Sequence, residues 1–103
     1  MHRIRIHAAA ADEAAEAAAW YESSRGGLGA EFQRALEAAL DLLEDGAVPL
    51  VPALGSAGRQ GLKRLVLRRF PYDIVVHETA DELIVVAFSH HSRRPGYWRG
   101  RIR

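Results

Sequence analysis

Hydrophobic positions in the first quarter of the chain indicate a short strand followed by a helix. Residues 3–7, RIRIH, alternate polar and β-branched side chains, which predicts a strand. Residues 8–24 are rich in alanine, the strongest helix former, and carry acidic residues early, where they suit the positive end of the helix dipole. The apolar face of this helix is expected to comprise Ala14, Ala18 and Tyr21, flanked by Ala10, Ala17 and Trp20.

The second helix has the clearest periodicity. Apolar residues recur at helical spacing between residues 28 and 45, while charged residues repeat on the opposite side. The apolar positions are Leu28, Phe32, Leu36, Leu40 and Leu43, backed by Ala35 and Ala39. Because only the turn sequence SSRGG at 23–27 separates the two helices, they are expected to form an antiparallel hairpin.

The C-terminal half reads as a loop followed by three strands. Residues 46–61 hold four glycines and two prolines without periodicity, which favours a surface loop. The last strand is almost continuously apolar, which predicts an interior strand covered on both faces. The three strands are predicted at 62–69, 73–78 and 83–89, joined by a turn at Pro71 and a tight connection at 79–82.

The element order is therefore β-α-α-β-β-β, typical of an α+β fold. We expect a helical hairpin packed on one face of a small, curved, mainly antiparallel sheet. At 103 residues, the chain is expected to form one domain, residues 1–103, with a single modest core.

Composition excludes several classes of site and suggests a compartment. The chain has no cysteine, so it can form neither a disulfide nor a thiolate metal site. No apolar run approaches the roughly 18 residues that a membrane span needs, and the first residues do not resemble a signal peptide. We therefore expect a cytoplasmic protein without a membrane partner.

Charge separates along the chain although the formal net charge is only +1. Residues 1–58 carry four arginines against nine acidic residues, a balance of −5, and residues 59–103 carry ten basic against four acidic residues, a balance of +6. Arginine favours planar, bidentate contacts to carboxylates and phosphates. This distribution predicts one surface that faces an anionic partner.

The histidines do not have the spacing of a metal site. His90 and His91 are adjacent, so on a strand they point to opposite faces and cannot chelate one ion together. His2, His7 and His77 are scattered, and no nucleotide-binding glycine motif follows a strand. We therefore expect neither a metal nor a cofactor.

Basic and titratable residues of the last strands offer one candidate for catalysis. On the open face of the sheet, such a group could orient a phosphodiester and stabilise developing charge. The alternative is that the arginines are solvated residues of the sheet surface. The candidate catalytic residues are Arg64, Arg68, His90, His91, Arg93 and Tyr97, with Arg69 and Arg94 nearby.

The basic C-terminal tail, at about 93–103, combines arginines with aromatic residues. Pro95, Tyr97 and Trp98 argue for docking rather than fraying, because a tryptophan and a tyrosine are costly to leave exposed. We expect an anchored base and a mobile end beyond Trp98.

Two stretches resemble a known family. WYESSRGGLGAEF, followed by LRRFPYDIVVHETADELIVVAFSHHSRRPGYWRGR, is similar to toxins of the RelE/ParE superfamily, ParE branch, of type II toxin–antitoxin modules. The resemblance runs from about Ile4 to Arg101 and implies the same β-α-α-β-β-β fold. It also implies a cognate antitoxin as partner, in a hetero-oligomer, and growth inhibition as the activity, with plasmid stabilisation as a possible role.

The resemblance further implies a target. The RRPGYWR ending matches the ParE pattern, which implies inhibition of DNA gyrase without catalysis. Target-binding residues are then expected to be Arg93, Arg94, Tyr97, Trp98, Arg99 and Arg101. Antitoxin-binding residues are expected to be Trp20, Tyr21, Leu28, Phe32, Arg64 and Arg68.

Two alternatives stay open. RelE-like relatives cleave mRNA on the ribosome, and the candidate catalytic residues above would serve that activity, with a general base from outside the central strands, such as Glu78. The second alternative is an inactive homologue that only binds its antitoxin.

Overall fold

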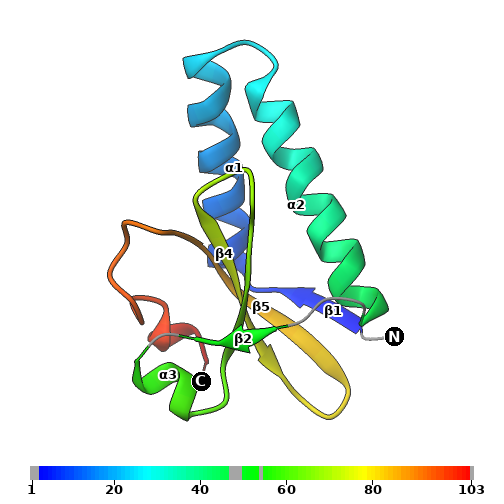
Figure 1. Ribbon diagram of the computed structural model, residues 1–103, viewed down its shortest axis with the longest axis vertical. Helices are drawn as coiled ribbons and strands as arrows, with labels where there is room; N and C mark the ends of the chain where they lie inside the picture. Colours follow the sequence, from blue (N-terminus) through cyan, green and yellow to red (C-terminus); the bar gives the residue numbers. More distant parts are fainter. Residues whose placement is uncertain (1–2, 47–49, 54, 103) are drawn as a thin grey trace.

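The structure is a computed structural model that describes residues 3–46, 50–53 and 55–102. Two long helices lie on one side of a twisted sheet, as Figure 1 shows. The elements are β1 (Arg3–Ile6), α1 (Ala8–Ser24), α2 (Leu28–Asp45), β2 (Val51–Pro52), α3 (Ser56–Arg59), β3 (Lys63–Val66), β4 (Tyr72–Glu78), β5 (Glu82–His90) and the 3-10 helix η1 (Arg99–Ile102). The predicted α+β fold, with a helical hairpin on the sheet, is confirmed.

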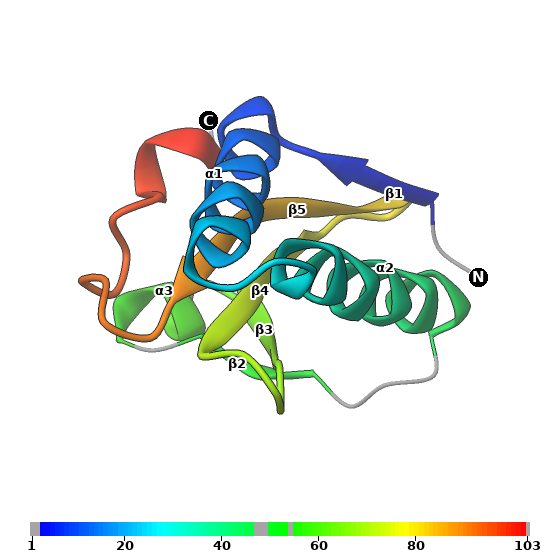
Figure 2. The same cartoon turned by 90° about the horizontal axis from the view of Figure 1, so that it is seen from above.

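The five strands form one mixed sheet in the order β1-β5-β4-β3-β2. β1 runs parallel to β5, and the other neighbouring pairs are antiparallel. The parallel pair requires a crossover connection, which the chain between β1 and β5 supplies. Figure 2 shows α1 and α2 side by side above the sheet, with the C-terminal segment beyond α1.

The turn between the helices is fixed by a carboxylate. Glu22 near the end of α1 accepts hydrogen bonds from the backbone N–H groups of Gly27 (2.9 Å) and Gly29 (3.0 Å). These amides belong to the N-cap residue and the first turn of α2, where backbone donors lack helical partners. At Gly29 the helices approach so closely that a Cβ would lie 2.5 Å from the carbonyl oxygen of Ala18. The RGGLG segment therefore forms the turn of the helical hairpin.

The main core lies between the hairpin and the sheet. Phe32 is completely buried and Leu36 is 5% exposed, as the periodicity of the second helix predicts. Their partners on the sheet include Ile74, Val76 and Val85. Four aromatic rings pack in tilted or edge-to-face contacts within this core, with centroids 5.0–6.4 Å apart: Tyr21, Phe32, Phe70 and Tyr72. Motifs that carry the family resemblance therefore build the core.

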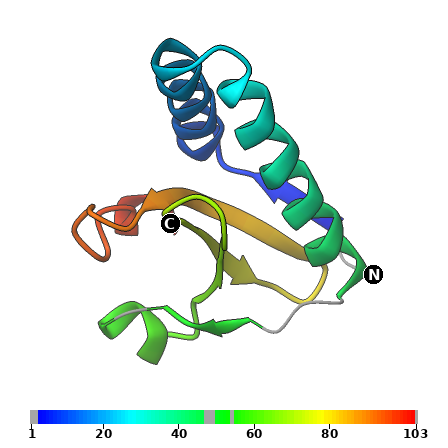
Figure 3. The ribbon, with the colours of Figure 1, turned by 45° about the horizontal axis from the view of Figure 1, so that its top comes forward.

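The opposite face of the sheet is also covered. Val75, Val86 and Ala87 are buried on that side beneath Trp98, which is 3% exposed. The prediction that the last strand is covered on both faces is confirmed, and its second cover is the C-terminal tail. Figure 3 shows this tail continuing from the end of β5, at the end of the sheet that lies away from α2.

The prediction of a surface loop at 46–61 is wrong in part. Its described residues include the short strand β2, which pairs with β3, and the one-turn helix α3; residues 47–49 and 54 lie outside the described residues. β3 ends at Val66, before the predicted 69, because the chain turns back through Phe70 toward β4. Trp20, expected beside the core face, is 65% exposed.

Candidate functional site

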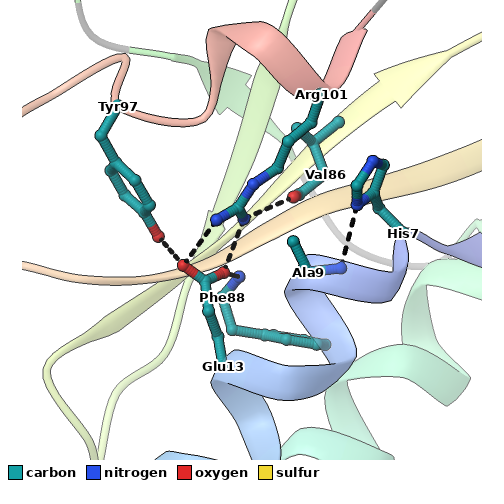
Figure 4. A network of polar contacts seen from close by, with 7 residues as sticks. All are labelled: His7, Ala9, Glu13, Val86, Phe88, Tyr97 and Arg101. Atoms are coloured by element: carbon teal, nitrogen blue, oxygen red, sulfur yellow. Dashed lines mark hydrogen bonds and ion pairs between the residues drawn. The ribbon is translucent and has the colours of Figure 1, made fainter.

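Glu13 of α1 organises the docked tail, as Figure 4 shows. Its carboxylate accepts hydrogen bonds from Arg101 through both terminal nitrogens, at 2.9 and 3.2 Å, and from the hydroxyl of Tyr97. The Glu13 and Arg101 side chains are only 14% and 19% exposed. This bidentate pair links the first helix to the last turn of the described chain, so the tail is packed through residue 102, beyond the predicted anchor at Trp98.

The same pair provides hydrogen-bond partners for backbone groups at the edge of β5. β1 pairs with β5 only as far as Val85, which leaves backbone groups of β5 without a strand partner on that side. Glu13 accepts from the amide of Phe88 (3.1 Å), and Arg101 donates to the carbonyl of Val86 (3.1 Å). Buried backbone groups need such partners. The two side chains therefore close an edge that a further strand would otherwise be free to extend.

Tyr97 is held in this network. Burial, followed by the hydrogen bond to Glu13, raises the pKa of its phenol to about 12. The guanidinium of Arg93 lies over the ring, 3.9 Å from its centroid. The phenol therefore stays protonated at neutral pH, and its hydroxyl is already engaged as the donor of a hydrogen bond to the Glu13 carboxylate.

A second cluster of charged residues lies on the tail-covered face of the sheet. Asp73 of β4 bonds to His91 through one oxygen (2.8 Å) and to Arg64 of β3 through the other (3.2 Å). Asp73 is 9% exposed, whereas the His91 side chain is 42% exposed. A small cavity of about 50 Å³ borders these three residues together with Arg93. An imidazole oriented by a carboxylate, beside two arginines, is an arrangement that can move protons near a phosphate.

Asp73 corrects the sequence interpretation. An acid was expected only outside the central strands, with Glu78 as the candidate, but Asp73 lies on the central strand β4 next to the candidate histidine. Glu78 instead lies 3.5 Å from Lys63 at the other end of that strand. The signal was present in the sequence, since an aspartate at the start of an apolar strand is unusual and requires a partner.

The other candidate catalytic residues do not all join this cluster. His90 borders the same cavity, but its ring accepts a hydrogen bond from the amide of Ser92 (3.0 Å) and packs edge-on against Tyr72. Arg68 lies on a different groove, beside α2. Arg69 bonds to Glu31 on α2, which lowers the pKa of that carboxyl.

The expected target-binding residues divide into buried and exposed groups. Trp98 is buried and Arg101 faces Glu13, so both hold the tail in place. Arg93, Arg94 and Arg99 lie at exposed positions of the docked tail. The structure thus brings three arginines of the predicted surface to the outside of one segment.

The expected antitoxin-binding residues also divide. Phe32 is fully buried within the core, so it lies out of reach of a partner. Tyr21 and Leu28 are partly buried against that core, and Trp20 is exposed. Arg68 borders an apolar groove of about 600 Å³ between α2 and the segment that contains β3 and the residues after it. Its lining includes Ala35, Ala38, Leu42, Val66, Arg64 and Arg69.

No protein-family model and no curated protein matches the chain. Within the described residues, no three or more histidine, aspartate or glutamate side chains are grouped so that they could hold a metal ion. None of the helices in residues 3–46, 50–53 and 55–102 has the length and apolar character needed to span a bilayer.

Proposed function

We propose that the chain is the toxin of a type II toxin–antitoxin module of the RelE/ParE kind, which inhibits DNA gyrase and is neutralised by a cognate antitoxin. The order of the two helices and the strands agrees with what the resemblance implies. The motifs that carry the resemblance are also the residues that build the aromatic core and the docked tail.

The observation that carries the choice of target is the state of Tyr97. An RNA-cleaving relative uses basic residues together with a C-terminal tyrosine or histidine. Here the phenol donates to Glu13 and its pKa is raised to about 12, so it is a poor proton carrier at neutral pH. A tail whose tyrosine is used for docking favours recognition of a protein surface over catalysis.

Exposed arginines supply the proposed recognition surface. Arg94 and Arg99 lie on the outside of the tail, and the ring of Trp98 beneath them is buried in the second core. Arginine is common among the residues that dominate protein interfaces. We therefore assign gyrase recognition to the outer face of residues 93–99.

The groove beside α2 supports a separate site for the antitoxin. Its floor is apolar and includes Leu42, which is 45% exposed, and Val66, which is 42% exposed. Arg68 and Arg69 border it. An antitoxin segment with apolar anchors and acidic residues would complement this combination.

The decisive experiment assays the purified chain in parallel for gyrase supercoiling and for ribosome-dependent mRNA cleavage. We expect loss of supercoiling and intact mRNA. The double variant Arg94→Glu/Arg99→Glu should lose inhibition, because it reverses the charge of the exposed tail. The control Arg3→Glu/Arg34→Glu changes the net charge equally, outside the tail, and should keep inhibition. Equal loss in both variants would contradict recognition by the tail.

The second candidate is the mRNA endonuclease, and the contact between His91 and Asp73 favours it. In that activity His91 would transfer the proton while Arg64 and Arg93 stabilise the phosphate. His91→Ala should then lower cleavage by a factor of about 10² or more. Under the gyrase proposal the same substitution keeps toxicity. Cleavage of mRNA by the intact chain, lost in His91→Ala, would replace the gyrase proposal.

A further inference from the structure

A cavity of about 360 Å³ lies where β1, the start of α1, β4, β5 and η1 meet. It shares no lining residue with the cavity at Asp73. Four basic side chains line it: Arg5, His7, His77 and Arg101. The remaining walls are mostly apolar and include Ile84 and Ile102. This volume lies in the range of about 300–1,000 Å³ that is usual for small-molecule sites.

The ionisable side chains that line this cavity are all basic. Among the described residues, no carboxylate lines it. Arg101 and Arg5 pair with Glu13 and Glu82, which lie outside the lining. Arg5 contacts Glu82 through Nε and Nη2, so its Nη1 remains for another acceptor. An anion in the cavity would meet Nη1 of Arg5 without displacing Glu82.

The two histidines add donors. His7 caps α1, because its Nδ1 accepts a hydrogen bond from the amide of Ala9 (3.0 Å). Since Nδ1 is the acceptor, the proton of the neutral ring must lie on Nε2, which leaves an N–H donor. Figure 4 shows this capping contact close to Arg101 and Val86. The side chain of His77 has no hydrogen bond or ion pair within the described residues.

We propose that this cavity binds a phosphate group, either as free phosphate or as the terminal phosphate of a small metabolite. Arginine and imidazole N–H groups are strong donors to phosphate oxygens. The isoleucine walls suit an organic body attached to the phosphate. Because the lining includes both β1 and η1, the bound anion bridges the sheet and the docked tail. This site does not depend on the proposed function.

The test is titration of the purified chain with adenosine 5′-monophosphate, inorganic phosphate and adenosine, followed by calorimetry and by the ring-proton NMR signals of His77. We expect adenosine to bind at least about tenfold more weakly than its monophosphate. Arg5→Gln and His77→Gln should each weaken phosphate binding about tenfold, the usual scale for hydrogen bonds to charged groups. Arg3→Gln, on the same strand but outside the lining, is the matched control.

The arms distinguish the sources of the phosphate. Equal affinity for inorganic phosphate and the monophosphate assigns the site to the free ion, and tighter binding of the monophosphate assigns it to a phosphorylated metabolite. Absence of binding by both phosphates overturns the proposal. So does binding that Arg5→Gln and His77→Gln leave unchanged.

Discussion

At the scale of single residues, Glu13 joins segments of the chain that are far apart in sequence. One carboxylate reaches the amide of Phe88, the hydroxyl of Tyr97 and the guanidinium of Arg101. These partners lie 75 to 88 residues away along the chain. Loss of this carboxylate leaves a partly buried arginine without its counter-charge.

The first prediction is that Glu13→Gln destabilises the fold by about 3 kcal/mol, the scale for removing one partner of a buried ion pair. Urea unfolding measures the change. Glu16→Gln, one turn later on the same helix and exposed, is the control and should stay within about 0.5 kcal/mol of the parent chain. Equal stability of the two variants would show that the Glu13 network does not hold the tail.

The second prediction concerns alkaline pH. The pKa of Tyr97 is raised from 10.0 to about 12, so the folded state retains the proton more strongly than the unfolded state. Its contribution to stability is therefore complete below pH 10 and is lost as pH rises toward 12. Tyr97→Phe should reduce this alkaline loss, measured from urea midpoints on either side of pH 10. Burial also raises the pKa of Tyr21 and Tyr72, so part of the loss remains.

At the scale of elements, the helical hairpin depends on a close approach rather than on a large apolar face. α1 buries only alanines completely or nearly so, namely Ala10, Ala17 and Ala18. Small side chains let α2 lie close, and Gly29 packs against the carbonyl of Ala18. The larger residues of α2 then fill the space above the sheet.

The third prediction follows from that approach. Gly29→Ala should destabilise the chain by about 1–3 kcal/mol, because the new methyl group meets backbone that cannot move aside easily. Gly26→Ala is the control, since its Cβ would have only ordinary contacts, the nearest at 3.9 Å. Thermal unfolding of both variants decides the matter. Destabilisation that is larger in Gly26→Ala would contradict the packing at Gly29.

At the scale of the whole molecule, the tail is part of the fold. Trp98 and its neighbours cover the second face of the sheet, and Arg101 closes the edge of β5. Deletion of residues 98–103 would therefore remove core as well as surface. Such a deletion cannot separate recognition from stability, whereas substitutions at exposed tail arginines can.

The fourth prediction compares these two kinds of change. Trp98→Ala should cost about 3–5 kcal/mol, the usual range for truncating a buried aromatic residue. Arg94→Glu should leave stability almost unchanged, because that side chain is exposed. Urea unfolding and growth inhibition, measured on both variants, separate folding from recognition. A fully stable Trp98→Ala variant would contradict the second core.

Much of the fold follows from local pattern. Helical spacing placed the second helix from Leu28 to Asp45. Alternation placed β1, and apolar runs between turns placed β4 and β5, with each end within one residue of the structure. Such periods reflect which side of an element faces apolar neighbours, so the sequence reveals them directly. The sequence predicted poorly those segments whose structure depends on distant partners. An example is β2, which forms by pairing with β3.

The candidate sites required the tertiary structure. By itself, the sequence determined the order of the two long helices and of β1, β3, β4 and β5, the separation of charge and the identity of the titratable residues. It could not show that Asp73 meets His91, or that Glu13 meets Arg101, because ion pairs form between residues that strand register and helix packing bring together. A basic tail looks the same in sequence whether its arginines face solvent or a buried carboxylate. Folding decided that Arg94 faces outward and Arg101 inward, because only the latter has an acidic partner at the unpaired edge of β5.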